Sequence, residues 1–422
     1  MTPDADEQVR QDGGRARPFK GRLPGPDALA QFGRRYVVGA FVATLLVPGL
    51  ALSLSPKFRQ AASTVVAGDY DATALRQTLR DSTPLWAKAS TAYGTALFRL
   101  RTSSNPRNGI IGKDGFIFLG DAYQDAFSQA IHRRSLSDAQ AGAWVEVLDI
   151  QRRWLAARGI PLLFVVGPSP ASIYPDKLPE WATLELGRPS SLDRILAASA
   201  RIGLDGSIVD LRKALTDARA KADTYSPRNT HWTDFGASVA WGQVAKVLAG
   251  LVPDFQAFGT DGSVGVVTNP NGPSDYVNLL GIDIKNPWTA YQLATPFPPM
   301  EIDGENGKTA QSSGAPTDVA TLPRATRTVG APTHKKALVI RDSMGDSLSP
   351  FLQATFEETH QLRITLSADG SRIMPPDQIQ HIVDEVVRFK PDVVIYVMTE
   401  RLLVMPFEDA EQWRRAFGRG GA

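Results

Sequence analysis

The chain has no cysteine among its 422 residues, which excludes disulfides, thiolate metal sites and a cysteine nucleophile. Histidine is also sparse: the five histidines are scattered, and none forms a His-x-x-x-His pair or another close ligand spacing. We therefore predict no metal site. The net charge is only +2, and no Lys/Arg-rich block with interleaved aromatic residues is present, so we expect no nucleic-acid partner.

Charged residues are absent from the nineteen-residue stretch 36–54, which is about long enough to cross a bilayer. Arg34 and Arg35 stand at its entrance, as the positive-inside rule favours for a cytoplasmic N-terminus. A cleaved signal peptide and a buried core helix are the alternatives, but the leader before this stretch is long for a signal peptide. We predict a disordered cytoplasmic tail at 1–35 and an uncleaved transmembrane anchor at 36–55.

The remaining chain alternates helical patterns with short apolar runs. Residues 56–107 read as a helical stalk or packing segment, and residues 108–121 as a hairpin around Lys113-Asp114-Gly115. Expected helices cover about 138–158, 191–201, 213–222 and 377–389, and expected strands cover 160–166, 208–211, 337–340 and a run within 391–403. This alternation predicts an α/β domain at 108–422, with a mainly parallel sheet covered on both faces, that is, three α/β/α layers.

Residues 252–333 break this rhythm. They are rich in Gly, Pro, Asn, Ser and Thr, with only scattered short apolar groups. We read them as an extended, irregular insertion with room for one hairpin. A substrate-facing insertion and a surface excursion both fit this composition.

Ser343 lies where the apolar strand 337–340 gives way to a helical pattern after Gly345. An α/β sheet presents nucleophiles at such a strand-to-helix turn, and backbone N–H groups at the start of the helix are candidates for stabilising an oxyanion. The competing reading is a helix-capping serine. Asp342 is expected to hold the turn by hydrogen bonding rather than to act as an acid.

A serine nucleophile needs a base, and His231 is the best candidate. It precedes an expected helix with Asp234 as a possible N-cap, and an imidazole suits general-base chemistry near neutral pH. The competing reading is a structural histidine packed beside Trp232. The functional hypothesis requires these two distant turns to meet.

Five blocks, in this order, resemble the SGNH-hydrolase-like alginate and exopolysaccharide O-acetyltransferase family: GKDGFIFLGD, SIYPDKLP, NTHWTDFGA, VIRDSMGDSLSPFL and PDVVIYVMTERLL. They cover roughly residues 108 to 405. The resemblance implies an SGNH-like fold with Ser343 as nucleophile and His231 as catalytic histidine. It also explains why the histidine precedes the serine along the chain.

The sequence departs from the family at the third catalytic position. The family places an aspartate two residues before the histidine, whereas this chain has Asn229. An aspartate fixes the imidazole tautomer and stabilises the imidazolium, and replacing it by asparagine in a serine protease lowers the rate by ~10⁴. Three readings remain open: Asn229 orients His231 through its carbonyl, a carboxylate such as Asp223 or Asp234 substitutes, or chemistry is lost and binding remains.

Three further side chains are candidates for substrate contact. Arg341 beside the serine is either structural or positions a substrate oxygen. Trp232 and Tyr174 offer faces on which a sugar could stack, although core packing is the competing role. Glu400 and Arg401, at the end of the last apolar strand, are expected to form a buried ion pair.

We therefore expect an O-acetyltransferase that moves an acetyl group through a serine acyl-enzyme onto an exopolysaccharide hydroxyl, without a cofactor. By resemblance, the acetyl donor arrives through a multi-spanning membrane acyltransferase, and the protein is anchored in the bacterial inner membrane with its catalytic domain in the periplasm. The alternatives are a carbohydrate esterase of the same fold and a non-catalytic polysaccharide-binding or scaffold subunit, which Asn229 motivates.

Overall fold

The computed structural model describes residues 84–183, 186–260, 265–304, 309–313, 323–368, 370–405 and 410–419, with positions 56, 59 and 63. The predicted tail at 1–35 and the predicted anchor at 36–55 lie outside these residues. Within the described residues, no helix has both the length and the apolar character needed to cross a bilayer. Contacts divide the chain into two units, Met1–Ala89 and Ser90–Ala422, and the central sheet lies in the second.

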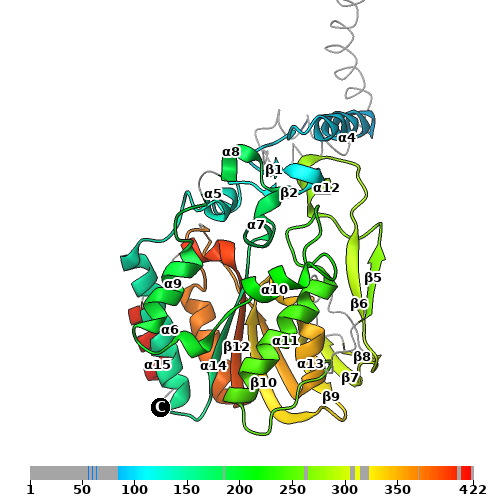
Figure 1. Ribbon diagram of the computed structural model, residues 1–422. Helices are drawn as coiled ribbons and strands as arrows, with labels where there is room; N and C mark the ends of the chain where they lie inside the picture. Colours follow the sequence, from blue (N-terminus) through cyan, green and yellow to red (C-terminus); the bar gives the residue numbers. More distant parts are fainter. Residues whose placement is uncertain are drawn as a thin grey trace, which may run out of the picture. The chain divides into compact units, whose positions relative to one another are not determined.

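An eight-stranded sheet forms the centre of this unit, in the order β4-β3-β12-β10-β11-β9-β7-β8 (Figure 1). Its first five strands run parallel: β4 (Ile208–Asp210), β3 (Leu162–Gly167), β12 (Val393–Thr399), β10 (Thr333–Arg341) and β11 (Phe356–Arg363). The last three pair antiparallel: β9 (Pro323–Thr328), β7 (Pro299–Gly304) and β8 (Thr309–Ser313). The predicted mainly parallel sheet is therefore confirmed for the core strands.

Helices cover both faces of the sheet, as the continuous apolar strands predict. Leu162, Phe164 and Val166 of β3 belong to one apolar cluster, whereas Leu163 and Val165 belong to the other. The first cluster packs under α6 (Asp138–Ala156), α9 (Ser191–Ala200), α14 (Pro376–Phe389) and α15 (Ala410–Arg419); the second packs under α10 (Arg212–Ala218), α11 (Asp234–Leu251) and α13 (Ser349–Thr355) (Figure 1). The three-layer α/β/α arrangement is confirmed.

Local signals set most helix boundaries. Ser137 and Gln140 form a capping box at the start of α6, and Gly159, just after its end, has a φ of +72°. At the start of α11 the prediction is corrected: the N-cap is Thr233, whose side chain accepts a hydrogen bond from the Gly236 N–H, and Asp234 is the first helical residue. Thr233 satisfies an N–H deeper in the first turn, which is the function of a cap.

The region read as an irregular insertion contains more regular structure than its composition predicts. Strands β5 (Gly265–Asn269) and β6 (Trp288–Gln292) form a separate antiparallel pair, and the short helix α12 (Asp275–Leu280) lies between them in sequence. Strands β7, β8 and β9 of the same region extend the central sheet. The one expected hairpin is thus accompanied by three additional sheet strands.

Smaller elements precede the sheet. Strands β1 (Gly109–Ile111) and β2 (Ile117–Leu119) form the predicted hairpin, and helix α4 (Pro84–Arg99) comes before it. Of three further short helices, α5 (Ala126–Ala130) follows the hairpin, whereas α7 (Pro170–Ile173) and α8 (Glu180–Thr183) follow the sheet strand β3.

Candidate active site

Ser343 begins a single 3-10 turn, Ser343–Gly345, directly after β10. The Asp342 carboxylate accepts the Met344 N–H through one oxygen and the Thr399 N–H through the other, each at 2.8 Å. These bonds tie the turn to the end of the neighbouring strand β12, so Asp342 has the turn-holding contacts expected of it. The Met344 N–H is thereby occupied, which removes it as a donor to an oxyanion.

Asp342→Ala is expected to lower the free energy of unfolding by about 3 kcal/mol, because two backbone N–H groups at a largely buried site lose a charged acceptor. Urea unfolding of the two proteins measures the difference. Asp217→Ala, which removes one partner of an exposed ion pair with Lys213, should change stability by less than about 0.5 kcal/mol. Equal effects of both changes would contradict the turn-holding role of Asp342.

His231 lies in the loop that leads into α11. An isolated bridge pairs Tyr225 with Trp232, and Trp232 is only 1% exposed. Gly236 is required one turn further on, because a Cβ there would lie 2.1 Å from the Thr224 carbonyl oxygen. The buried tryptophan and this close approach of backbone segments fix where the histidine emerges.

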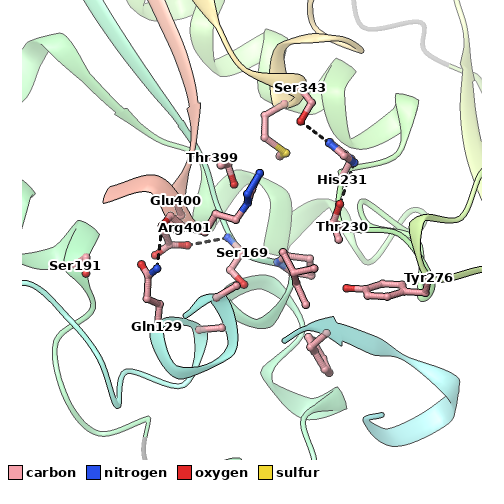
Figure 2. Close-up of a pocket in the computed structure, with 16 residues that line it drawn as sticks. Gln129, Ser169, Ser191, Thr230, His231, Tyr276, Ser343, Thr399, Glu400 and Arg401 are labelled. Carbon is pink, nitrogen blue, oxygen red and sulfur yellow. Dashed lines mark hydrogen bonds between the residues drawn. The ribbon is translucent and has the colours of Figure 1, made fainter. Parts of the chain in front are cut away.

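The two turns meet, although 112 positions separate them: His231 Nε2 lies 2.9 Å from Ser343 Oγ (Figure 2). Both side chains are partly exposed, so the pair is accessible to a substrate. The distance is within hydrogen-bond range, as a nucleophile and its general base require.

The other ring nitrogen, His231 Nδ1, faces three oxygen atoms. Asn229 Oδ1 and Thr230 Oγ1 each lie at 3.1 Å, and Asp275 Oδ2 lies at 3.3 Å. The Asn229 amide is held in this orientation, since its Nδ2 donates to the Pro273 carbonyl and its Oδ1 also accepts the His231 backbone N–H. The carbonyl oxygen of Asn229 therefore faces the ring.

These contacts determine the tautomer of the neutral ring. The Thr230 hydroxyl donates its hydrogen to the Asp275 carboxylate, which leaves only its lone pairs for His231 Nδ1. All three oxygens are consequently acceptors, and Nδ1 carries the hydrogen. Nε2 then presents its lone pair to the Ser343 hydroxyl, which is the protonation state a general base needs.

Asp275 is the residue that sequence reasoning missed. It is the first residue of α12 and also accepts the Thr230 backbone N–H at 3.0 Å. Burial by itself would raise the pKa of the Asp275 carboxyl. The hydrogen bond from His231, the charge that its ring carries when protonated, and the Thr230 donors outweigh burial and hold the pKa at about 2. The carboxylate is thus ionised throughout the neutral range.

The carboxylates proposed from the sequence as substitutes have other contacts. Asp223 accepts the Tyr174 hydroxyl at 3.4 Å, and Asp234 accepts the Trp288 indole N–H at 3.0 Å. Asp275 therefore takes the place suggested for them beside His231. No local sequence spacing identifies Asp275, because its loop contacts His231 only in the folded chain.

Ser343 and His231 open into a pocket between the end of β12, the β2 strand and the short helices α5 and α7 (Figure 2). Within the described part of the chain, two buried polar atoms of its lining lack a hydrogen-bond partner: Gln129 Oε1 and Tyr276 Oη. Arg401 also lines the pocket, and its guanidinium makes a 3.3 Å contact with the neutral side chain of Gln124. These groups leave hydrogen-bonding capacity for a polar ligand.

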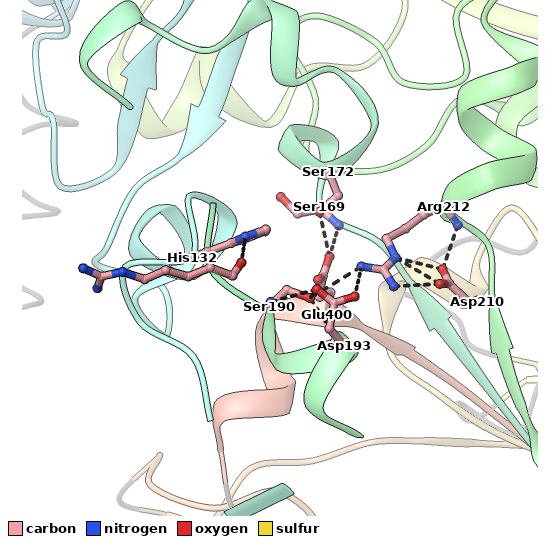
Figure 3. Close-up of polar contacts among 9 residues, drawn as sticks. His132, Ser169, Ser172, Ser190, Asp193, Asp210, Arg212 and Glu400 are labelled. Atoms are coloured by element: carbon pink, nitrogen blue, oxygen red, sulfur yellow. Dashed lines mark hydrogen bonds and ion pairs between the residues drawn. The ribbon is translucent and has the colours of Figure 1, made fainter. Parts of the chain in front are cut away.

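Glu400 lines the same pocket, and Figure 3 shows its polar contacts. Its carboxylate accepts the Ser169 N–H at 2.7 Å and contacts the Ser172 hydroxyl at 3.2 Å, so the expected pair with Arg401 is replaced by contacts to the start of α7. Burial raises the pKa of Glu400, against the lowering effect of the Ser169 hydrogen bond and the charge of Arg212. Arg212 itself bridges Asp193 and Asp210.

The three side chains predicted to touch substrate do not line this pocket. Arg341 is fully buried and binds Gln361 and Asp346, while Trp232 and Tyr174 are 1% and 2% exposed. Their prediction as substrate contacts is corrected to packing roles, because their neighbours in the fold enclose them. Within the described ranges, no group of three or more acidic or histidine side chains is arranged to hold a metal ion.

Comparisons with known proteins place this geometry in a family context. Residues 110–314 match the family model described as "SGNH hydrolase-like domain, acetyltransferase AlgX". The probable alginate O-acetylase AlgJ of Azotobacter vinelandii is 26% identical over 254 residues, covering 58% of this chain and 60% of that protein. Its counterpart in Pseudomonas aeruginosa is 27% identical over 201 residues, covering 47% and 48%.

This chain therefore spans less than two thirds of the length of the curated relatives it matches. Among solved structures, the O-acetyltransferase domain of Pseudomonas putida AlgJ has a TM-score of 0.45 and 16% identity, covering 74% of this chain and 99% of that domain. The family-model match and the curated relatives confirm the resemblance to SGNH-hydrolase-like O-acetyltransferases that the sequence motifs indicate.

Proposed function

We propose that this chain, which resembles the SGNH-hydrolase-like O-acetyltransferases, transfers acetyl groups onto hydroxyls of a bacterial exopolysaccharide. The observation that carries the proposal is the 2.9 Å contact between His231 Nε2 and Ser343 Oγ in the lining of a pocket. The Nδ1-protonated ring supports it, since that tautomer is ready to remove the serine proton.

In the first half-reaction, Ser343 Oγ attacks the carbonyl carbon of an acetyl donor while its proton moves to His231 Nε2. The bond between the acetyl carbon and the donor's leaving atom then breaks, and the leaving group takes that proton. The products are an acetylated serine and a neutral histidine.

In the second half-reaction, a sugar hydroxyl enters the pocket and gives its proton to His231 Nε2 as its oxygen attacks the acetyl carbon. The bond to Ser343 Oγ breaks, and the serine oxygen recovers the proton from the imidazolium. The acetyl group ends on the sugar, and both residues return to their starting states.

The pocket chemistry favours an acidic sugar as acceptor. Arg401 offers a cation whose contact in the described chain is a neutral amide, and Tyr276 Oη and Gln129 Oε1 are buried without partners. A sugar carboxylate would satisfy the guanidinium, and sugar hydroxyls would satisfy the other two groups. Both curated relatives carry names that refer to alginate, which is consistent with this choice.

The cellular setting belongs to the same proposal. We place a single membrane anchor at 36–55, the catalytic domain at 108–422 in the periplasm, and the acetyl supply in a multi-spanning membrane acyltransferase. The nineteen uncharged residues at 36–54 support the anchor.

The deciding experiment incubates the full-length protein in detergent with a small acetyl ester, with and without an acidic oligosaccharide. We expect the oligosaccharide to gain the mass of one acetyl group. Consumption of the ester with release of acetate and no mass gain would instead assign an esterase, since water would then be the acceptor.

Arg401→Gln is expected to lower kcat/KM for an oligouronate acceptor about 10-fold or more, because a charge-assisted hydrogen bond to the carboxylate is lost. A neutral oligosaccharide of the same length should react equally well with both proteins. Mass spectrometry of the acceptors under single-turnover conditions measures both rates. A parallel loss with both acceptors would contradict a carboxylate-specific role for Arg401.

A further inference from the structure

We propose that the task of the usual triad aspartate is divided between two residues: Asn229 orients the His231 ring, and Asp275 supplies the negative charge. This inference rests on the proposed acyl-transfer function. It makes Asn229 and Asp275 positioning residues, since both act through His231.

The orienting half of the task fits Asn229. Its Oδ1 accepts both the backbone N–H of His231 at 2.9 Å and the ring Nδ1–H at 3.1 Å. Its Nδ2 is held at 3.0 Å from the Pro273 carbonyl, so the amide cannot flip without losing all three bonds. The side chain therefore avoids the failure expected of an asparagine at this position, which is to present its N–H₂ group to the ring.

The neutral amide of Asn229 cannot supply the negative charge that a triad aspartate provides. When His231 accepts the serine proton, the ring becomes an imidazolium that a nearby anion must stabilise. Asp275 Oδ2 lies 3.3 Å from Nδ1, and two hydrogen bonds from Thr230 hold that oxygen in place. With both residues beside one nitrogen, the ring meets an oriented acceptor and a fixed charge.

Other charged groups near the ring do not serve this purpose. Asp346, on the serine turn, interacts electrostatically with His231, but its carboxylate already forms an ion pair with the buried guanidinium of Arg341. Both oxygens of Asp342 bind backbone N–H groups, and Arg401 in the pocket has the wrong sign. Asp275 is left as the carboxylate that can respond to the new charge.

The division of tasks also assigns a structural role to the irregular region 252–333. Pro273 and Asp275 belong to one short stretch of it, and this stretch both holds the Asn229 amide and delivers the carboxylate. Asn286, further along, donates to the same Pro273 carbonyl. The region thus acts on the catalytic histidine through Pro273 and Asp275, while Tyr276 of the same region lines the pocket.

The test compares the full-length wild type with Asp275→Asn and Asp275→Ser, both of which keep an acceptor for the Thr230 N–H but carry no charge. We expect each to lower kcat for acetyl-ester turnover about 10²-fold with little change in KM. The loss should be smaller than the ~10⁴ of a triad lacking its aspartate, because Asn229 still fixes the tautomer. The acid limb of the kcat/KM profile should move to lower pH, since loss of the anion favours the neutral imidazole.

A rescue variant separates charge from structure. Asn229→Asp combined with Asp275→Asn returns a carboxylate to the ring and should recover at least 10-fold of the lost rate. Asp283→Asn, which neutralises an exposed carboxylate of the same region, is the matched control and should behave as wild type. Circular dichroism checks that each variant is folded.

Activity within 3-fold of wild type for the folded Asp275 variants, with an unmoved acid limb, would overturn the division of tasks. Loss of activity without rescue by the double variant would overturn it as well, since Asp275 would then matter only for structure. If wild type and Ser343→Ala were equally inactive or equally active, the proposed acyl transfer itself would fail instead.

Discussion

Ser343→Ala is expected to lower acetyl transfer by at least about 10⁴-fold, and to abolish the covalent acetyl-enzyme altogether. The hydroxyl is the group that forms the acyl bond, and it is the hydroxyl that lies 2.9 Å from the general base His231 Nε2. Residual turnover would come only from the pocket's binding of donor and acceptor. Intact-protein mass spectrometry after a short exposure to acetyl ester tests for the adduct, and steady-state assays measure the rate.

The matched control is Ser347→Ala, which removes a hydroxyl from the same turn, where it contacts Asp234 rather than His231. It should retain wild-type turnover and the acetyl adduct. In cells, polymer acetylation that survived Ser343→Ala but disappeared on deletion of the whole protein would favour the non-catalytic scaffold reading.

His231→Ala is the second large change, with an expected loss of at least about 10⁴-fold in the rate of serine acetylation. Without the imidazole, the serine proton has no acceptor at 2.9 Å, so the nucleophile attacks as a neutral hydroxyl. The double variant with Ser343→Ala should be no slower than either single variant, because the two side chains act as one unit. Additive losses would mean that they act in separate steps.

The control for this change is His334→Ala, since His334 is an exposed histidine whose ion-pair partner is Glu357. It should leave the rate of acetylation unchanged. A comparable loss in His334→Ala would point to a general effect on folding rather than to proton transfer at the serine.

Sequence reasoning was most successful where structure follows from local pattern. Continuous apolar runs predicted the parallel strands β3, β4, β10 and β12, but not the polar strand β11. The strand-to-helix turn at Ser343 followed from the change of period. His231 was predicted as the general base because it lies in the block NTHWTDFGA, directly before a helix with a recognisable N-cap. These features depend on residues close together in the chain.

Features that depend on tertiary packing were missed. Strands β7 to β9 are polar and short, so their sequence does not distinguish sheet from loop. Arg341 and Trp232 adjoin the catalytic pair in sequence, but their side chains point into the core, and one sequence cannot reveal that orientation. Asp275 reaches His231 only because its loop folds back, which no spacing rule encodes.

Asp275 lies 45 positions beyond Thr230, the residue whose hydroxyl and N–H it binds, and far outside any short catalytic signature. A search that demands an acid two places ahead of the histidine would discard this chain as a pseudoenzyme. Relatives with the same asparagine should accordingly be sorted by what their distant loops bring to the ring, not by the signature alone.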